Sequence, residues 1–378
     1  MRIAYLLADP GIGVFGTKGA SVHVQEMVRA MRAEGHQVTV FCTRLDDEVP
    51  ADLLDLDVRH LPLRKTTSLA EREIAIGEAA TRLAKAAEAE GFDAVYERYS
   101  LFSDAGARLA TQAPLILEVN APLLVEQRRH RGLHDAAAAE SATARQFAAA
   151  SVISCVSEPV AEWALTQGAP RSRVAVIPNG VNTARITPRQ DAEVPRPDGR
   201  LTVGFVGTLK PWHGTELLLE AIALSSEQFD LLVCGTGPEE PKLEELATCL
   251  GIRDRVWFLG AVPPAEVPSI LHRLDIAVAP YPQGDHYFSP LKIYEYMAAG
   301  LPIVASAIGE IPRQLAEGRH GALVPPGNVS ELAAALDSLA RNPERRRRLG
   351  RAARAAAVAE HDWRSRARGL FDLLEGAS

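Results

Sequence analysis

The sequence predicts an α/β protein built from two doubly wound domains, each a parallel sheet covered by helices. Three observations predict this class. Short apolar runs typical of buried strands alternate with longer helical segments from the first residues onward. The chain has 378 residues, more than one typical core, and 47% of them are hydrophobic. The alternation breaks near the middle of the chain and then starts again.

The first alternating series predicts an N-terminal domain of residues 1–182. Its helices include residues 21–34, 68–90 and 136–150, and Gly35 is placed to end the first of them. Its strands are predicted at residues 3–7, 37–42, 94–96, 115–119, 152–154 and 174–177. The turn-rich residues 178–182 close the series, and the polar, proline-rich residues 187–200 are typical of a linker.

The second series predicts a C-terminal domain of residues 183–361. Its strands are predicted at residues 201–206, 231–234, 256–259, 276–279, 302–305 and 322–324. A last helix, about 362–378, follows a break at Glu360-His361-Asp362 and is expected to dock away from its own domain. In such folds ligands bind beyond the carboxyl ends of the strands, so we expect a central cleft faced by both domains.

Composition argues against several classes of protein. A net charge of −7 argues against a nucleic-acid partner. No apolar run approaches the roughly 20 residues of a membrane span, although contact with a membrane surface stays open, as does the oligomeric state. The apolar start lacks a small-residue cleavage site and predicts a first strand, hence a cytoplasmic location. Cysteines without CxxC spacing predict buried thiols over a disulfide or zinc framework: Cys42, Cys155, Cys234 and Cys249.

The first strand is followed by a glycine-rich loop, residues 11–19, and then by a helix. The loop lacks the Lys-Ser/Thr ending of a P-loop and the spacing of a dinucleotide fingerprint, so it is a weak motif alone. Glycines allow close approach of a ligand to the backbone, and a helix start attracts anions. Contact of Gly16 with a ligand and an ordinary strand-to-helix turn are the two interpretations.

The most informative stretch is Ser289 to Gly300, which follows a strand and a polar loop and predicts a helix. Ser289 is a candidate N-cap and Pro290 suits the first helical position. Lys292 places a cation in the first turn, which costs the helix about 0.3 to 1 kcal/mol, so an anion should compensate. Glu295 lies one turn beyond Leu291, where a carboxylate can accept hydrogen bonds from two adjacent hydroxyls. These residues predict a nucleoside diphosphate, with phosphates on the helix start and a ribose on Glu295.

Taken in order, five segments resemble the retaining family 4 glycosyltransferases of the GT-B fold. They are Gly16-Thr17-Lys18-Gly19, residues 176–181, residues 205–210, residues 235–239 and residues 295–304. The resemblance covers essentially the whole chain. It implies two Rossmann-like domains and transfer of a sugar from a nucleoside diphosphate sugar to an acceptor, without a metal or prosthetic group. It also implies a donor held mainly by the C-terminal domain, an acceptor held mainly by the N-terminal domain, and a final helix that crosses back onto the latter.

The residues and the resemblance together predict three groups of site residues. Catalysis is assigned to Asn120, Lys210 and Lys292. Donor binding is assigned to Gly16, Thr17, Thr208, His213, Gly235, Val262, Tyr287, Phe288, Ser289, Pro290, Leu291 and Glu295. Acceptor binding is assigned to Lys18, Arg128 and Arg129, which belong to the first loop and to a basic run able to face an anionic acceptor.

The sequence also departs from the family pattern. The first of two glutamates separated by seven residues would fall at Tyr287; Asp285, His286 or the backbone of residues 287–290 are the alternatives for its contact with the donor sugar. The family's arginine and lysine on the first loop of the second domain would fall at Thr208 and His213. The family's histidine would fall at Asn120, which cannot act as a general base. Lys210 and Lys292 are then the cations left to meet the diphosphate.

Several alternatives remain open from sequence. A covalent glycosyl enzyme would need a carboxylate such as Glu118, whereas the resemblance implies same-face substitution assisted by the departing phosphate. A nucleotide-sugar 2-epimerase and a noncatalytic nucleotide-sugar binding protein are the other classes. Uridine is favoured over guanosine, and the acceptor is a small molecule, a lipid or a saccharide. Asp55-Leu56-Asp57 mimics a metal-binding motif far from the nucleotide segments, and residues 345–348 are typical of a solvated helix face.

Overall fold

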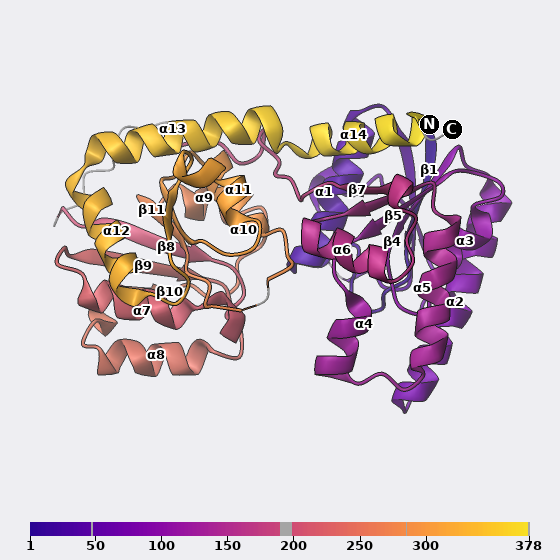
Figure 1. Cartoon of the computed structure of the whole chain (residues 1–378), viewed down its shortest axis with the longest axis horizontal. Helices are drawn as coiled ribbons and strands as arrows, with labels where there is room; N and C mark the ends of the chain where they lie inside the picture. Colours follow the sequence, from indigo (N-terminus) through magenta and orange to yellow (C-terminus); the bar gives the residue numbers. More distant parts are fainter. Residues whose placement is uncertain (47, 190–198, 285, 377–378) are drawn as a thin grey trace. The chain divides into compact units, whose positions relative to one another are not determined.

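The computed structural model describes residues 1–46, 48–189, 199–284 and 286–376, with the side chains of residues 130 and 131 left aside. It divides into two compact units, each with its own parallel sheet. The first unit comprises Met1–Asn179, Tyr287–Ser289 and the chain from Trp363 onward. The second comprises Gly180–His286 and Pro290–Asp362. Figure 1 labels the elements along the chain.

The first unit has a parallel sheet in the order β3-β2-β1-β4-β5-β6-β7. Its strands are β1 (Arg2–Leu7), β2 (Gln37–Cys42), β3 (Asp57–His60), β4 (Ala94–Arg98), β5 (Leu115–Val119), β6 (Val152–Cys155) and β7 (Val174–Val176). Its helices are α1 (Gly19–Ala33), α2 (Leu69–Glu90), α3 (Ala105–Leu109), α4 (Leu123–Glu126), α5 (Ala136–Ala149), α6 (Glu158–Thr166) and α14 (Trp363–Gly376). The strand order reverses between β1 and β4, which is the switch point of a doubly wound sheet.

The second unit repeats this plan in the order β10-β9-β8-β11-β12-β13. Its strands are β8 (Leu201–Val206), β9 (Phe229–Cys234), β10 (Val256–Phe258), β11 (Ile276–Ala279), β12 (Ile303–Ser306) and β13 (Ala322–Val324). Its helices are α7 (Thr215–Leu224), α8 (Glu240–Cys249), α9 (Val267–Leu271), α10 (Leu291–Ala298), α11 (Ile311–Gln314), α12 (Val329–Arg341) and α13 (Pro343–Glu360). Here the switch point lies between β8 and β11.

Local sequence explains where many of these elements begin and what they bury. Ser68, Asp135 and Asn328 cap α2, α5 and α12 through side chains that accept a backbone N–H. The central strands are apolar because helices cover both faces, and they form the middle of a separate core in each unit. The predicted α/β class with two doubly wound parallel sheets is confirmed.

Helix α14 belongs to the first unit although α13 directly precedes it in the chain. It runs beside α1 (Figure 1) and buries Trp363, whose ring is nearly perpendicular to that of His23, with the ring centres 4.8 Å apart. Arg364 and Arg368 both bond the carboxylate of Glu34, the C-cap residue of α1. The packing of this last helix follows from its apolar stripe rather than from its neighbours in sequence.

The start of α10 differs from its prediction. The helix begins at Leu291 with Pro290 as N-cap, so the assignments of Ser289 to the N-cap and of Pro290 to the first helical position are wrong. The hydroxyl of Ser289 instead accepts the backbone N–H of Asn179, and the Asn179 side chain donates to the Ser289 carbonyl at 2.7 Å. The Ser289 hydroxyl that was expected to cap the helix therefore bonds Asn179, which is remote in sequence.

The structure also places the Asp55-Leu56-Asp57 run and the four cysteines. Asp55 pairs with Arg32, and Asp57 begins the edge strand β3, where it pairs with Arg59. The four cysteines have free thiols, and three of them, Cys42, Cys155 and Cys234, are buried. Residues 190–198 of the expected linker and Asp285 lie outside the described residues.

Candidate functional site

In the second unit the loops at the carboxyl ends of β8, β9 and β10 are packed backbone against backbone. The N–H of Gly207 donates to the Cys234 carbonyl at 2.9 Å, and the N–H of Gly235 donates to the Gly260 carbonyl at 2.8 Å. Gly235 has φ +132°, and a β-carbon there would lie 2.0 Å from the Gly207 carbonyl oxygen. Gly235, which was predicted to bind the sugar donor, must therefore be glycine for the two backbones to pack this closely. Val262 is half-buried in the loop just beyond Gly260.

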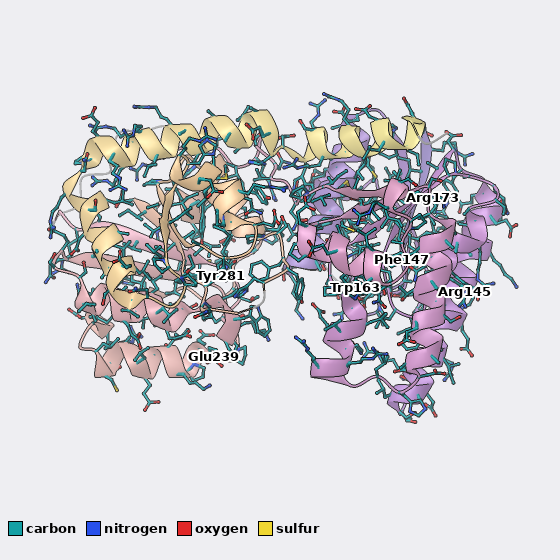
Figure 2. All side chains as sticks on the ribbon, in the orientation of Figure 1. Arg145, Phe147, Trp163, Arg173, Glu239 and Tyr281 are labelled. Carbon is teal, nitrogen blue, oxygen red and sulfur yellow. The ribbon has the colours of Figure 1, made fainter. Side chains whose placement is uncertain are left out.

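Lys292 on α10 is buried beside these loops. Its Nζ lies 4.2 Å from the centre of the Phe205 ring and 5.1 Å from that of Tyr281, which Figure 2 labels. The side chain also touches Gly207, where a β-carbon would lie 3.1 Å from Nζ. Lys292 is 8% exposed, and its Nζ has no hydrogen-bond partner among the described residues. Because an unpaired buried ammonium is costly, this arrangement is suited to receiving an anion.

The histidine that stands in place of the family's lysine carries no charge. His213, in the short helical turn Pro211–His213, donates from Nδ1 to the carbonyl of Thr208. Burial, and next the positive charge of Lys292, lower the pKa of His213 to about 3. The side chains near the end of β8 that can carry a positive charge are therefore Lys292, on another element, and Lys210, whose Nζ lies 5.8 Å from the ring centre of Trp212.

Glu295 lies three residues beyond Lys292 on α10 and is half-buried. Tyr296 fixes the rotation of this helix, because its hydroxyl oxygen accepts the Val206 N–H at 2.8 Å. Burial raises the pKa of the Cys234 thiol to about 11, and the charge of Glu295 adds to the increase. Glu295 thus lies close enough to Cys234, at the end of β9, and to Lys292 for its charge to act on both.

In the first unit the backbone N–H groups of the glycine loop form hydrogen bonds within the protein. The N–H groups of Val14 and Phe15 donate to carbonyls of residues 44 and 45, and the N–H of Gly16 donates to Gly13. The Asp46 carboxylate packs on this loop: a β-carbon on Gly16 would lie 2.6 Å from its Oδ2. These contacts favour the interpretation of an ordinary turn for Gly16, while Thr17 and Lys18 are exposed.

Beyond β5, Asn120 has a buried Nδ2 with no hydrogen-bond partner among the described residues. Glu118, two residues earlier, is 3% exposed and accepts hydrogen bonds from His23 at 2.5 Å, from Tyr96 at 2.6 Å and from Arg98 at 3.1 Å. These partners hold the pKa of Glu118 at about 2, well below its usual range, despite the opposing effect of burial. Its oxygens are committed inside the unit, which argues against a covalent role for Glu118.

Tyr287, which stands where the family has its first glutamate, bonds a different glutamate. Its hydroxyl donates to Glu126 at the end of α4, and its carbonyl accepts the Ser157 hydroxyl. Sequence reasoning did not single out Glu126, because nothing local connects it with residue 287. Phe288 is half-buried next to Tyr287, and Ser289 is buried against Asn179.

Two arginines of the basic run after α4 have different surroundings. Arg128 pairs with Glu140 on α5, whereas Arg129 is exposed. Trp212 was also not singled out from the sequence: it is 53% exposed, and the Nζ of Lys210 lies 5.8 Å from its ring centre. A pocket of about 430 Å³ near β13, lined by residues including Glu317, Glu331 and Arg345, contains none of the predicted site residues.

Two comparisons of sequence agree with this architecture. Residues 17–185 match the model described as glycosyltransferase family 4, and residues 187–356 match the model described as glycosyl transferases group 1. The phosphatidyl-myo-inositol mannosyltransferase of Mycobacterium leprae is 38% identical over 192 residues, 50% of this chain and 49% of the relative. The D-inositol 3-phosphate glycosyltransferase of Corynebacterium urealyticum is 32% identical over 220 residues, 54% of this chain and 51% of the relative. The chain thus spans about half the length of these relatives, although a Thermomonospora curvata relative of the same name matches over 98% of this chain and 93% of its own, at 27% identity.

Solved structures show the same fold. The sucrose-phosphate synthase of Thermosynechococcus elongatus superposes with a TM-score of 0.75 at 23% identity, over 100% of both chains. Anabaena HepE, solved with UDP and glucose, gives 0.72 at 18% identity, also over 100% of both chains. Two parallel-sheet units with this strand order define the GT-B class of α/β proteins. Within that class the chain belongs to glycosyltransferase family 4, as the matches of both its halves show.

One further observation concerns membranes. None of the helices in the described part of the chain combines the length and the apolar character that crossing a bilayer requires.

Proposed function

We propose that this chain is a retaining, metal-independent glycosyltransferase that moves a sugar from a nucleoside diphosphate sugar to an acceptor hydroxyl. The observation that carries the proposal is the buried Lys292 side chain, whose Nζ has no hydrogen-bond partner among the described residues and lies at the carboxyl edge of the second sheet. A diphosphate supplies the missing anion. The amino end of α10, an eight-residue helix, adds N–H groups and the positive end of its dipole.

The rest of the donor extends from this anion site. Glu295, one turn along α10, accepts hydrogen bonds from the ribose hydroxyls, and the base lies toward Gly260 and Val262. Uridine is the preferred base over guanosine. Thr208, His213, Pro290 and Leu291 line the diphosphate. Neutral His213 serves as a hydrogen-bonding side chain there.

Catalysis is positioning and electrostatic stabilisation of the departing diphosphate by Lys292 and Lys210. The departing phosphate oxygen takes the proton of the acceptor hydroxyl, and the new bond forms on the face that the phosphate leaves. The committed contacts of Glu118 support this route over a covalent intermediate. Asn120 orients a sugar, because its buried amide still has a donor to offer.

The acceptor belongs to the first unit in this proposal. Arg129, Arg128 and Lys18 are cations able to meet an anionic acceptor, and the relatives named above act on inositol phosphate or phosphatidyl-myo-inositol. A phosphorylated polyol, free or as a lipid headgroup, is therefore the acceptor class to test first. Contact with the inner face of a membrane and a location in the cytoplasm accompany the lipid form.

A thermal-shift panel of nucleotide sugars tests the donor. A ligand at 100 times its dissociation constant stabilises by about 2.7 kcal/mol, so a true donor is distinguished from inert compounds. Product analysis with and without acceptor then separates the classes: a 2-epimerase releases free nucleotide without an acceptor, and a binding protein turns nothing over.

Glu295→Gln tests the placement of the ribose. The change keeps the shape, removes the charge and turns one acceptor into a donor, so we expect weaker binding of UDP and of the intact donor by about 1.5 to 3 kcal/mol. A 2′-deoxy donor should lose most of its disadvantage in the variant. Calorimetry that finds wild-type affinity, or undiminished discrimination against the deoxy compound, contradicts the role of Glu295.

A further inference from the structure

The environment of Lys292 favours the neutral amine in the ligand-free protein. Two aromatic rings and the backbone of Gly207 surround its Nζ, which makes no hydrogen bond to the described residues. Aromatic faces attract a cation only weakly. They do not replace the water that an ammonium loses on burial.

We propose that Lys292 gains a proton when the donor binds, so that binding of the nucleoside diphosphate sugar is coupled to the uptake of about one proton. This inference rests on the proposed function, which supplies the diphosphate. In the free protein the uncharged amine avoids an unpaired buried charge. In the complex the diphosphate makes the ammonium the favoured form, because an opposite charge within hydrogen-bond distance favours the charged state.

Among the titratable groups around Lys292, the Lys292 amine is the one expected to change its protonation when the donor binds. On the β8 loop, His213 is already neutral, since its pKa is lowered to about 3. From the loop after β11, burial raises the pKa of Tyr281, and burial raises that of Tyr296 on α10. Glu295, on the same helix, is the negative charge that favours the ammonium, but burial outweighs it and lowers the pKa of Lys292 to about 7. Lys210 and His286 complete the set of nearby titratable groups, as their charges act on His213.

The direction of the pH dependence follows from these values. Below pH 7 the amine is already protonated in the free protein, so donor binding takes up few protons. Above pH 7 the free protein holds the neutral amine and the complex holds the ammonium. We therefore expect uptake of about 0.1 proton at pH 6 and about 0.9 at pH 8, with affinity about tenfold weaker at pH 8 than at pH 6.

Isothermal titration calorimetry measures the uptake directly. Binding of UDP-glucose and of GDP-mannose is measured at pH 6, 7 and 8 in buffers of different ionisation enthalpy, and the slope of the observed enthalpy against that ionisation enthalpy is the number of protons. Intact nucleotide sugars are the correct probes, because the terminal phosphate of free UDP titrates near pH 6 itself. Binding at pH 8 without proton uptake overturns the inference and leaves the proposed donor site standing. Failure of every nucleotide sugar to bind a folded protein overturns the proposed function instead.

Two variants assign the proton to its residue. Lys292→Arg keeps a cation that stays charged at all these pH values, so uptake should vanish and affinity should lose its pH dependence. Lys210→Gln removes the neighbouring cation of the same site, so affinity should fall while uptake at pH 8 remains. Uptake that persists in Lys292→Arg belongs to another group, such as His286, and overturns the assignment to Lys292. The wild-type titration decides the coupling even if an arginine is not accommodated at position 292.

Discussion

Glu118 is a buried carboxylate at the centre of a polar cluster in the first unit. Its carboxylate joins α1, β4 and β5 through His23, Tyr96 and Arg98. Removing one partner from such a cluster leaves the others buried without compensation, which costs more than the net contribution of the intact pair. We therefore expect the cluster to stabilise the carboxyl edge of the sheet next to Asn120.

Glu118→Gln should destabilise the first unit by about 3 to 5 kcal/mol at neutral pH. The pKa of Glu118 is lowered from 4.5 to about 2 in the folded protein. Its contribution is therefore fully present above pH 4.5 and is lost as the pH falls toward 2, by about 3 kcal/mol in all. Urea unfolding at pH 3, 5 and 7 should show the gap between wild type and variant narrowing toward low pH.

An exposed pair offers the control for that measurement. Glu78 pairs with Arg64 where both side chains are about half exposed. Glu78→Gln should cost less than about 1 kcal/mol. A Glu118→Gln protein as stable as this control, or a gap that is unchanged at pH 3, would show that the buried cluster does not stabilise the fold in the way described.

At the scale of elements, α10 packs against α13, a later helix of the same unit. Arg354 on α13 donates to the carbonyls of Thr183, Ile186 and Ala298, which joins the start of the unit to the end of α10. Gly350, one turn earlier on α13, lets the two helices approach closely. A β-carbon there would lie 2.1 Å from the Gly300 carbonyl oxygen.

Gly350→Ala should therefore destabilise the second unit by about 1 to 3 kcal/mol, because neither backbone can yield without shifting a helix. Gly369→Ala is the matched control. It is also a helical glycine, but a β-carbon there meets nothing within 4 Å, so the better helix propensity of alanine should stabilise by about 0.5 to 1 kcal/mol. Thermal unfolding of the two variants should move in opposite directions; shifts of the same sign would contradict the close approach of α13 and α10.

At the scale of the whole molecule, the last helix completes a unit that begins at the other end of the chain. Trp363 is 4% exposed and meets His23, which itself bonds Glu118. The stability of α1 and of its polar cluster thus depends on residues more than 300 positions later. Residues of α13, immediately before Trp363, contribute to a different core.

Trp363→Ala should cost the first unit about 3 to 5 kcal/mol and leave the second unit unchanged. Hydrogen exchange resolved by peptide should show faster exchange in α1 and β5, with α10 and α13 as protected as before. Leu373→Ala, on the same helix but 42% exposed, should leave exchange in both units close to wild type. Equal loss of protection in α1 and α13 after Trp363→Ala would mean that the two units do not have separate stability.

Sequence alone determined what depends on local pattern and on the order of motifs. Apolar runs bounded by turn residues predicted strands such as β1, β5 and β8 within a residue or two, because burial on both faces leaves a continuous apolar signature. The order of short motifs predicted the family, which the matches of both halves confirm. The same reasoning placed Lys292 and Glu295 one turn apart on one helix.

Only the tertiary structure decided which partner each polar group meets. Local sequence favoured Ser289 as a helix cap, yet its hydroxyl accepts a hydrogen bond from the N–H of Asn179 instead. Lys292 looked like a first-turn cation at a loop tip, but the packing of α10 against β8 and the Gly207 loop buries it between Phe205 and Tyr281. Tyr287 finds Glu126, 161 residues away in sequence. The physical reason is common to all three: hydrogen bonding and desolvation depend on which atoms the fold brings within a few ångströms, and no local pattern carries that information.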